Sequence, residues 1–339
     1  GKKLKEKCFA EVLSERGVRV GVFGAMNTNY RTLNGYFVPD PWDTEGKTSP
    51  EWLQPFFDVV ASQVQESSRG VLKKKEAIKL AAFMARHGLQ AQTVLSILRQ
   101  LASEVLDAGA KWRRTMLLDE LSYDLFHSLN AQFDVEFASF FSNSTAHLQH
   151  YYWRNFEPEL FDSLPTDREH PSLADAVSFG YRRHDAILGR MMRDYPKSRL
   201  MLCTGLSQQP WTNTQKCLYR PIAFDHFLNW VGITHVEVKP VMAQQFHIEC
   251  ANEAEASRVC ALLTSMTLNE AQVMYVVKKG ESVFTGCQIE DSRLASETVH
   301  LGDKKIPFLK LFYQIHGMRS GRHHPEGALW VNTGSQRKK

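Results

Sequence analysis

The chain has 339 residues, of which 43% are hydrophobic and 23% charged, a composition typical of a soluble globular protein with one large α/β domain or two smaller ones. Its formal net charge is +4, and its basic residues are spread along the chain apart from short clusters at Lys2–Lys7, Lys73–Lys75 and Arg337–Lys339, so no nucleic-acid-binding groove is expected. No apolar run is long enough to span a membrane, and no basic-then-apolar leader is present.

The cysteines carry information about the cell compartment. There are six, at positions 8, 203, 217, 250, 260 and 287, and no two of them form a C-x-x-C pair. Cys203 lies inside an apolar segment that we expect to be a strand. The pattern favours a reduced, cytoplasmic protein.

The first 131 residues predict two strands and a helical region. A helix over residues 3–16 leads into a strand at Val18–Phe23 and a second at Leu33–Val38. From 49 to 131 the apolar residues recur at helical spacing, which predicts about four helices at 50–66, 72–87, 90–107 and 110–131. We interpret this region as a helical insertion that packs on a sheet, with a partner-binding helical surface as the alternative.

The next segment places polar groups at the end of a strand. Residues 134–141 form an apolar run of strand length, which breaks at Ser142-Asn143-Ser144, a sequence typical of a turn or helix cap. Asn143 and His147 are four residues apart and share a face if a helix follows, and His150 lies one step further along. In open α/β proteins such residues meet at the carboxyl edge of the sheet.

The remaining sequence predicts a further strand, a small α+β unit and a late histidine segment. A helix beginning near Ser172, with Asp175 three residues later as a capping pair, precedes a buried strand at 199–204. Residues 236–300 contain a β-α-β-β pattern: a strand at 245–249, a helix capped by Asn252 with Glu255, and strands at 273–277 and 282–288. His323 and His324 then precede the strand-like residues 328–331.

Three of these segments resemble, in chain order, the metal-binding motifs of the alkaline phosphatase superfamily, in particular its type I phosphodiesterase, nucleotide pyrophosphatase and sulfatase-like members. Asn143 to His147 is similar to D-x-x-x-H, with Asn in place of Asp. The loop Gly205–Pro210 lies where the family has S-D-H-G, and Gly321–Gly327 matches G-x-H-x-x-x-G. The resemblance covers residues 1–45, 134–210 and 315–332, and it implies that the family's opening strand and nucleophile helix would lie upstream of Gly1.

The resemblance implies a fold and a division of the chain. The fold would be a three-layer α/β/α, mostly parallel sheet with a helical insertion and a small α+β insertion, and the strands at 18–23, 134–141 and 199–204 would be neighbours in that sheet. The domains would be core α/β at 1–48, the helical insertion at 49–131, core α/β with the motif loops at 132–235, the α+β insertion at 236–300, and core completion with a basic tail at 301–339.

The resemblance also implies a metal site, altered here. Family members hold two zinc ions; the first site maps onto Asn143, His147 and His323, whereas the second loop offers Gln208 and Gln209 in place of anionic and imidazole ligands. Because amides are poor zinc ligands, we expect at most one divalent metal, zinc, weakly held, or none. Amides do bind sugars and phosphate esters, so Ser207, Gln208 and Gln209 are candidate substrate-binding residues.

Three functions remain open. The first is a divergent hydrolase or transferase of a phosphate or sulfate ester, on a small molecule or a glycan. The second is a catalytically silent binding or regulatory protein on the same fold. The third is a non-metal transferase whose acid-base group is His150 or His324. The metal reading requires His147 and His323, 176 residues apart, to converge on one ion.

Overall fold

The computed structural model describes residues 6–26, 32–43, 46–65, 74–162, 164–165, 169–212, 217–234, 236–241, 244–315 and 320–332. The chain divides into two compact units. The first comprises Gly1–Ala61, Val71–Thr212 and Arg319–Lys339, and the second Ser62–Gly70 and Asn213–Met318. The finer predicted boundaries, at residues 48, 131, 235 and 300, stay predictions.

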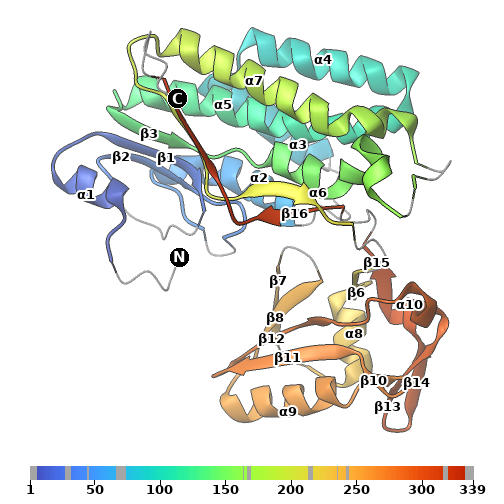
Figure 1. Cartoon of the computed structure of the whole chain (residues 1–339). Helices are drawn as coiled ribbons and strands as arrows, with labels where there is room; N and C mark the ends of the chain where they lie inside the picture. Colours follow the sequence, from blue (N-terminus) through green and yellow to red (C-terminus); the bar gives the residue numbers. More distant parts are fainter. Residues whose placement is uncertain are drawn as a thin grey trace. The chain divides into compact units, whose positions relative to one another are not determined.

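A small parallel sheet lies in the first unit (Figure 1). Its strands are β1 (Val20–Ala25), β2 (Gly35–Pro39) and β3 (Phe137–Phe140), in the order β2-β1-β3 with both pairs parallel. The central strand β1 is buried along most of its length, as a strand with parallel neighbours on both sides requires. Helix α1 (Phe9–Glu15) packs on β1. The three strands predicted up to residue 141 are therefore confirmed.

The helices of the first unit follow the predicted periodicity. The region from 49 to 131 contains η1 (Glu51–Leu53), α2 (Gln54–Gln65), α3 (Lys74–His87), α4 (Ala91–Leu106), η2 (Ala108–Arg114) and α5 (Thr115–Gln132). Beyond β3 come α6 (Ser144–Phe156), η3 (Pro158–Leu160) and α7 (Ala176–Asp194). The helix predicted from Ser172 begins later than expected, because Pro171–Asp175 forms a separate 3-10 turn, η4. Helices α6 and α7 pack closely at Gly180, where an added Cβ would lie 3.0 Å from Leu148 Cδ1.

The strand β4 (Met201–Thr204) corrects the predicted sheet. It pairs antiparallel with β17 (Ala328–Val331) in a separate two-stranded sheet, so the prediction that it neighbours β1 and β3 is wrong. A central parallel strand would be buried on both faces, but Met201, Cys203 and Thr204 are exposed. The first unit is mixed α/β, and a three-layer, mostly parallel sheet is not found in the described residues, where the sheets are small and mostly antiparallel.

A second antiparallel pair lies next in the chain. Strand β5 (Ser207–Pro210) pairs with β16 (Gly321–His324). The ladder is extended by Trp211, whose N–H donates to the carbonyl of Ser320 at 2.7 Å. The chain therefore leaves the first unit after β5 and returns to it at β16, with residues 213–318 of the second unit between them.

The second unit has its own core. Its main sheet, in the antiparallel order β11-β12-β8-β7, contains β7 (Glu237–Pro240), β8 (Gln245–Glu249), β11 (Met274–Lys279) and β12 (Ser282–Cys287), and α9 (Glu253–Thr264) packs on it. As predicted, the Asn252 side chain caps α9 by accepting the N–H of Glu255 at 2.9 Å. The other elements are β6 (Tyr219–Pro221), α8 (Phe224–Val231), β9 (Thr267–Leu268), β10 (Ala271–Gln272), η5 (Ser292–Ser296), β13 (Thr298–Leu301), β14 (Lys304–Pro307), α10 (Phe308–Leu311) and β15 (Phe312–Gln314).

Within the described ranges no helix combines the length and apolarity needed to cross a bilayer. All six cysteines are free thiols.

Candidate functional site

The pairing of β5 with β16 brings two predicted site residues face to face. His323 lies directly opposite Gln208, and His324 lies opposite Ser207. Directly opposed residues of an antiparallel pair project from the same face of the ladder, so Gln208 and His323 share a face. The Gln208 Nε2 atom lies 3.2 Å from Nδ1 of His323.

Helix α6 approaches this pair because residue 321 is glycine. A Cβ at Gly321 would lie 2.3 Å from the carbonyl oxygen of Gln149 and 3.2 Å from the Cα of His150. No residue with a side chain fits there without moving β16 away from α6. The glycine at position 321 therefore lets His150, on α6, reach the β5–β16 pair.

The buried residue Ser320 also shapes α6 at this point. Its N–H donates to the carbonyl of His150 at 2.8 Å, and its hydroxyl accepts the N–H of Arg154 at 3.0 Å. These two backbone groups would bond to each other in a regular helix, so Ser320 is inserted between them. The helix is kinked beside this insertion, with non-helical dihedral angles at Tyr152.

The result is a cluster of His150, Gln208 and His323. His150 Nδ1 lies 2.8 Å from the carbonyl oxygen of Gly321, which accepts a hydrogen bond and so fixes the proton on Nδ1. The Nε2 atom of His150 then accepts from Nε2 of Gln208 at 3.2 Å. The two imidazole rings lie 4.8 Å apart, centroid to centroid, at 84°. His323 is exposed and the other two are half-buried, so solutes can reach the cluster.

The charge of this cluster suits an anion. Its three side chains are two imidazoles and an amide, none of which carries a negative charge, and either imidazole becomes cationic on protonation. The Oε1 atom of Gln208 is buried and has no hydrogen-bond partner among the described residues. When His150 is protonated at Nε2 and the Gln208 amide rotates, this N–H can donate to Oε1 of Gln208. Protonation of His150 and the orientation of the Gln208 amide are therefore coupled.

The other predicted site residues lie around the cluster in different roles. Asn143 is the exposed N-cap position of α6, and its carbonyl accepts the N–H of His147 at 3.0 Å. The ring of His147 packs on Tyr151 with centroids 4.6 Å apart. His324 Nδ1 accepts the N–H of Glu326 at 3.2 Å, which places it in the turn after β16. Gln209 donates from Nε2 to the carbonyl of His323 at 3.2 Å, and the Ser207 N–H donates to the carbonyl of Glu326 at 2.8 Å.

These positions fit a zinc ion poorly. Catalytic zinc sites have three protein ligands drawn from imidazole, carboxylate and thiolate, whereas the cluster offers two imidazoles and an amide. In the part of the chain that the structure describes, no group of three or more His, Cys, Asp or Glu residues is arranged to hold a metal. The histidine seen in ring contact with His323 is His150, whereas the predicted zinc ligand of α6 was His147.

A second polar group lies at the carboxyl end of β3, where the sequence predicted a site. The hydroxyl of Ser142 donates to the carboxylate of Asp119, from α5, and lies 3.4 Å from Nδ1 of His184, from α7. Burial raises the pKa of Asp119 to about 6, against the opposing effect of hydrogen bonds from Ser142 and Ser144. Burial also lowers the pKa of His184, while the nearby Asp185 acts to raise it.

Sequence reasoning missed this group. Asp119 lies in a helix whose apolar periodicity gives it no special place, and Ser142 was interpreted as a turn or cap residue. The segment that ends β3 was the one available signal, since it identified the correct edge of the sheet. Because Asp119 accepts from the backbone N–H of Ser144 as well as from the Ser142 hydroxyl, we assign it to the anchoring of the α6 N-terminus.

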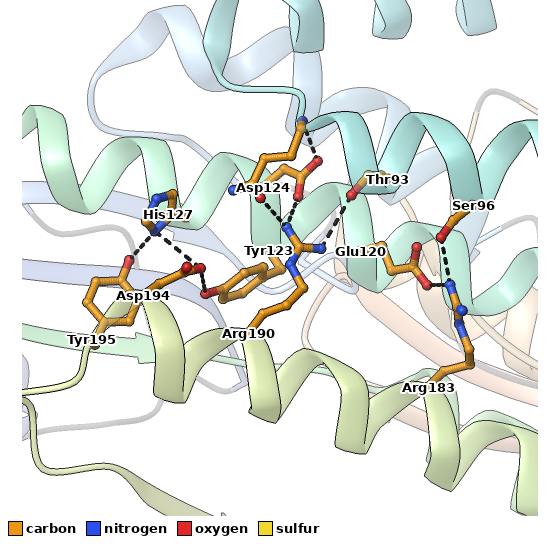
Figure 2. Close-up of polar contacts among 11 residues, drawn as sticks. Thr93, Ser96, Glu120, Tyr123, Asp124, His127, Arg183, Arg190, Asp194 and Tyr195 are labelled. Carbon is orange, nitrogen blue, oxygen red and sulfur yellow. Dashed lines mark hydrogen bonds and ion pairs between the residues drawn. The ribbon is translucent and has the colours of Figure 1, made fainter.

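Ion pairs between α5 and α7, with hydrogen bonds to α4, join these three helices (Figure 2). The guanidinium of Arg190, on α7, pairs with the fully buried carboxylate of Asp124, on α5, and also donates to Thr93 Oγ1 of α4 at 3.3 Å. Two turns earlier on α7, Arg183 pairs with Glu120 of α5 and donates to Ser96 Oγ of α4 at 3.0 Å. The ion pairs hold α5 to α7, the hydrogen bonds hold α4 to α7, and we assign these contacts a structural role.

Comparison with known proteins gives no relative from which a role could be transferred. No family model, no curated protein and no solved structure matches the chain.

Proposed function

We propose that the protein binds a phosphate or sulfate ester, carried by a small molecule or a glycan, at His150, Gln208 and His323, and acts on it as a hydrolase or transferase. The observation that carries the proposal is the convergence of two imidazoles from distant parts of the chain on one amide, in a solvent-accessible cluster without negative charge. Imidazoles are suited to general acid-base catalysis because their pKa lies near neutrality.

The cluster suggests a division of roles. Because Nδ1 of His150 donates to Gly321, its Nε2 is the basic nitrogen, and Gln208 donates to it in this structure. Once the amide of Gln208 turns to the substrate, Nε2 can take the proton of an attacking water or hydroxyl. The oxygen of that nucleophile then forms a bond to phosphorus or sulfur while the ester bond to the leaving oxygen breaks. His323 acts as the acid in its protonated form, in which Nδ1 donates to Oε1 of the rotated Gln208 amide and the proton on Nε2 passes to the leaving oxygen, which leaves a neutral imidazole.

The resemblance to the alkaline phosphatase superfamily supports the class of substrate. The parallel strands β2-β1-β3, followed by α6 with Asn143 and His147 in its first turns, are the part of the expected architecture that is present. Family membership is part of the proposal, as is a cytoplasmic location. Of the two acid-base candidates, the geometry favours His150 over His324.

The experiment is turnover of 4-nitrophenyl phosphate, bis(4-nitrophenyl) phosphate and 4-nitrophenyl sulfate. We expect hydrolysis of at least one, and a loss of about 10²–10⁴-fold in kcat for His150→Asn, in which the amide nitrogen keeps a donor near Gly321 but the Nε2 base is lost. His300→Asn, on the exposed surface of the second unit, is the matched control and should retain activity. His324→Asn distinguishes the two candidates.

Binding measurements separate an enzyme from a binding protein. Calorimetric titration with inorganic phosphate and sulfate should show binding that weakens in His150→Ala and His323→Ala. Binding of this kind without turnover of any ester would contradict catalysis and favour the binding or regulatory alternative. The absence of both binding and turnover would refute the whole proposal.

Zinc content tests the metal prediction separately. Two imidazoles and an amide should hold at most one zinc per chain, weakly enough for a chelator to remove it without unfolding the protein. Elemental analysis before and after dialysis against the chelator measures this. Two tightly held equivalents would contradict the prediction.

A further inference from the structure

Helix α4 is attached to the protein by its polar face. Thr93 and Gln100 are buried in it, and Ser96 is half-buried. Thr93 and Ser96 bind the guanidinium groups of Arg190 and Arg183, and Gln100 Nε2 donates to the carbonyl of Ala110 at 3.0 Å. Near its end, Glu104 accepts from Nε of Arg114 at 2.6 Å. The inward side of this helix is therefore the hydrophilic one.

The outward side is apolar. Its large side chains are exposed to the extent of 37% for Val94, 45% for Leu95, 57% for Leu98, 46% for Leu101, 87% for Val105 and 89% for Leu106. Ala91 and Ala102 are exposed on the same side. This is the reverse of an ordinary surface helix, whose apolar stripe faces the core. A contiguous exposed apolar stripe marks an interaction surface.

The spacing of the stripe identifies the kind of partner. Val94, Leu98, Leu101 and Val105 are separated by four, three and four residues, the heptad spacing of a helix that pairs with another helix. The series Val-Leu-Leu-Val, with the spacing four-three-four, is identical when read backwards. A second α4 running antiparallel therefore presents the same residues at the same positions.

We propose that α4 is the interface of a two-fold symmetric dimer, in which it packs antiparallel against α4 of a second copy of this chain. The axis passes between Arg99 and Gln100. Leu98 of each copy meets Leu101 of the other, and Val94 meets Val105. Such a contact is self-complementary, as a two-fold interface requires. Glu104 is already paired with Arg114, so it brings no unpaired charge to the contact.

The size of the contact sets its strength. A helix of sixteen residues is about 24 Å long, and one such seam lies at or below the low end of the roughly 1,200–2,000 Å² that stable interfaces bury. The dimer should therefore be weak and concentration-dependent, with a dissociation constant on the order of micromolar.

Sedimentation velocity over a concentration series tests the dimer. The parent chain should pass from monomer to dimer, and Leu98→Glu should weaken the dimer by at least ~10-fold, because it places two carboxylates in an apolar seam. The matched control is Ile78→Glu on α3, which replaces an exposed isoleucine outside the stripe and should leave the dimer unchanged. A parent chain that stays monomeric overturns the proposal. Sedimentation of that monomer with lipid vesicles, lost in Leu98→Glu, would assign the stripe to a lipid surface instead.

Cross-linking tests the orientation independently of any loss of folding. In a Cys203→Ser background, Val94→Cys and Val105→Cys proteins should form a disulfide when mixed and oxidised, and neither should form one alone. In the antiparallel pair, residues 94 of the two copies are eleven residues or about 16 Å apart along the helix, beyond the ~7 Å Cα separation that a disulfide allows. Cross-linking of Val94→Cys with itself would indicate a parallel pair and contradict the proposal.

Discussion

At the scale of single residues, Asp119 shows how burial makes a carboxyl group sensitive to pH. Its pKa rises from 3.8 to about 6 in the folded protein. Between these values the folded state holds the proton and the unfolded state does not, so this group's contribution to stability is largest at low pH and is lost as the pH rises toward 6.

Asp119→Asn should remove this dependence. A pKa shift of about two units corresponds to at most ~3 kcal/mol. As the pH rises from 4 to 7, the unfolding free energy of the variant should therefore increase relative to that of the parent by about 1–3 kcal/mol. Urea denaturation at both pH values measures the difference. The control Asp303→Asn, in an exposed turn, should have the same unfolding free energy as the parent at both pH values. If Asp119→Asn also matched the parent at both, the pKa of Asp119 would not be perturbed.

At the scale of elements, the candidate site depends on how closely β16 lies against α6. The approach is possible because residue 321 has no side chain, and it is fixed by the insertion of Ser320 into the helix. Neither element contains the site by itself. His150 comes from the helix, Gln208 from β5 and His323 from β16, so a small displacement of β16 separates the two imidazoles.

Gly321→Ala should produce this displacement. The added methyl would lie 2.3 Å from a backbone oxygen, which should cost about 1–3 kcal/mol of unfolding free energy and abolish the binding proposed for the cluster. Thermal or denaturant unfolding and phosphate titration measure the two effects. Gly205→Ala, where an added Cβ has no neighbour within 4 Å, is the control and should be nearly neutral.

At the scale of the whole molecule, residues 213–318 of the second unit are inserted between two paired strands. Trp211 and Ser320 are hydrogen-bonded where the chain leaves and returns, and the core of the second unit, from Tyr219 to Phe312, is its own. Each unit should therefore fold without the other.

Replacing residues 213–318 by a two-residue Asn-Gly turn should leave a folded first unit with β5 and β16 as a hairpin. Cooperative unfolding and retention of the phosphate binding proposed for the cluster measure this. The isolated segment 213–318 should give a dispersed NMR spectrum of its own. A first unit that is unfolded after the replacement would contradict the independence of the two cores.

The sequence predicted what is local and failed on what is distant. Alternating and helical spacing predicted β1, β3 and the four helices from 49 to 131, and the Asn252 cap was visible from two residues. The apolar run of β4 was consistent with a buried parallel strand, but pairing with β17 is decided by residues more than one hundred positions away. The same limit explains His150: the contact with His323 depends on Gly321 and Ser320, whose effect on α6 has no local signature.

The insertion between β5 and β16 has a consequence for the order of folding. During synthesis His150 and Gln208 leave the ribosome before residues 213–318 of the second unit, and His323 leaves after them. Closing a flexible loop of 106 residues costs roughly 2–3 kcal/mol more in chain entropy than closing a short turn. If the second unit folds first, the two ends of segment 213–318 are already held at a limited separation, and much of this entropy cost is removed. We therefore expect the candidate site to be among the last parts of the protein to form, and its rate of formation to depend on stability in a unit that contributes no residue to it.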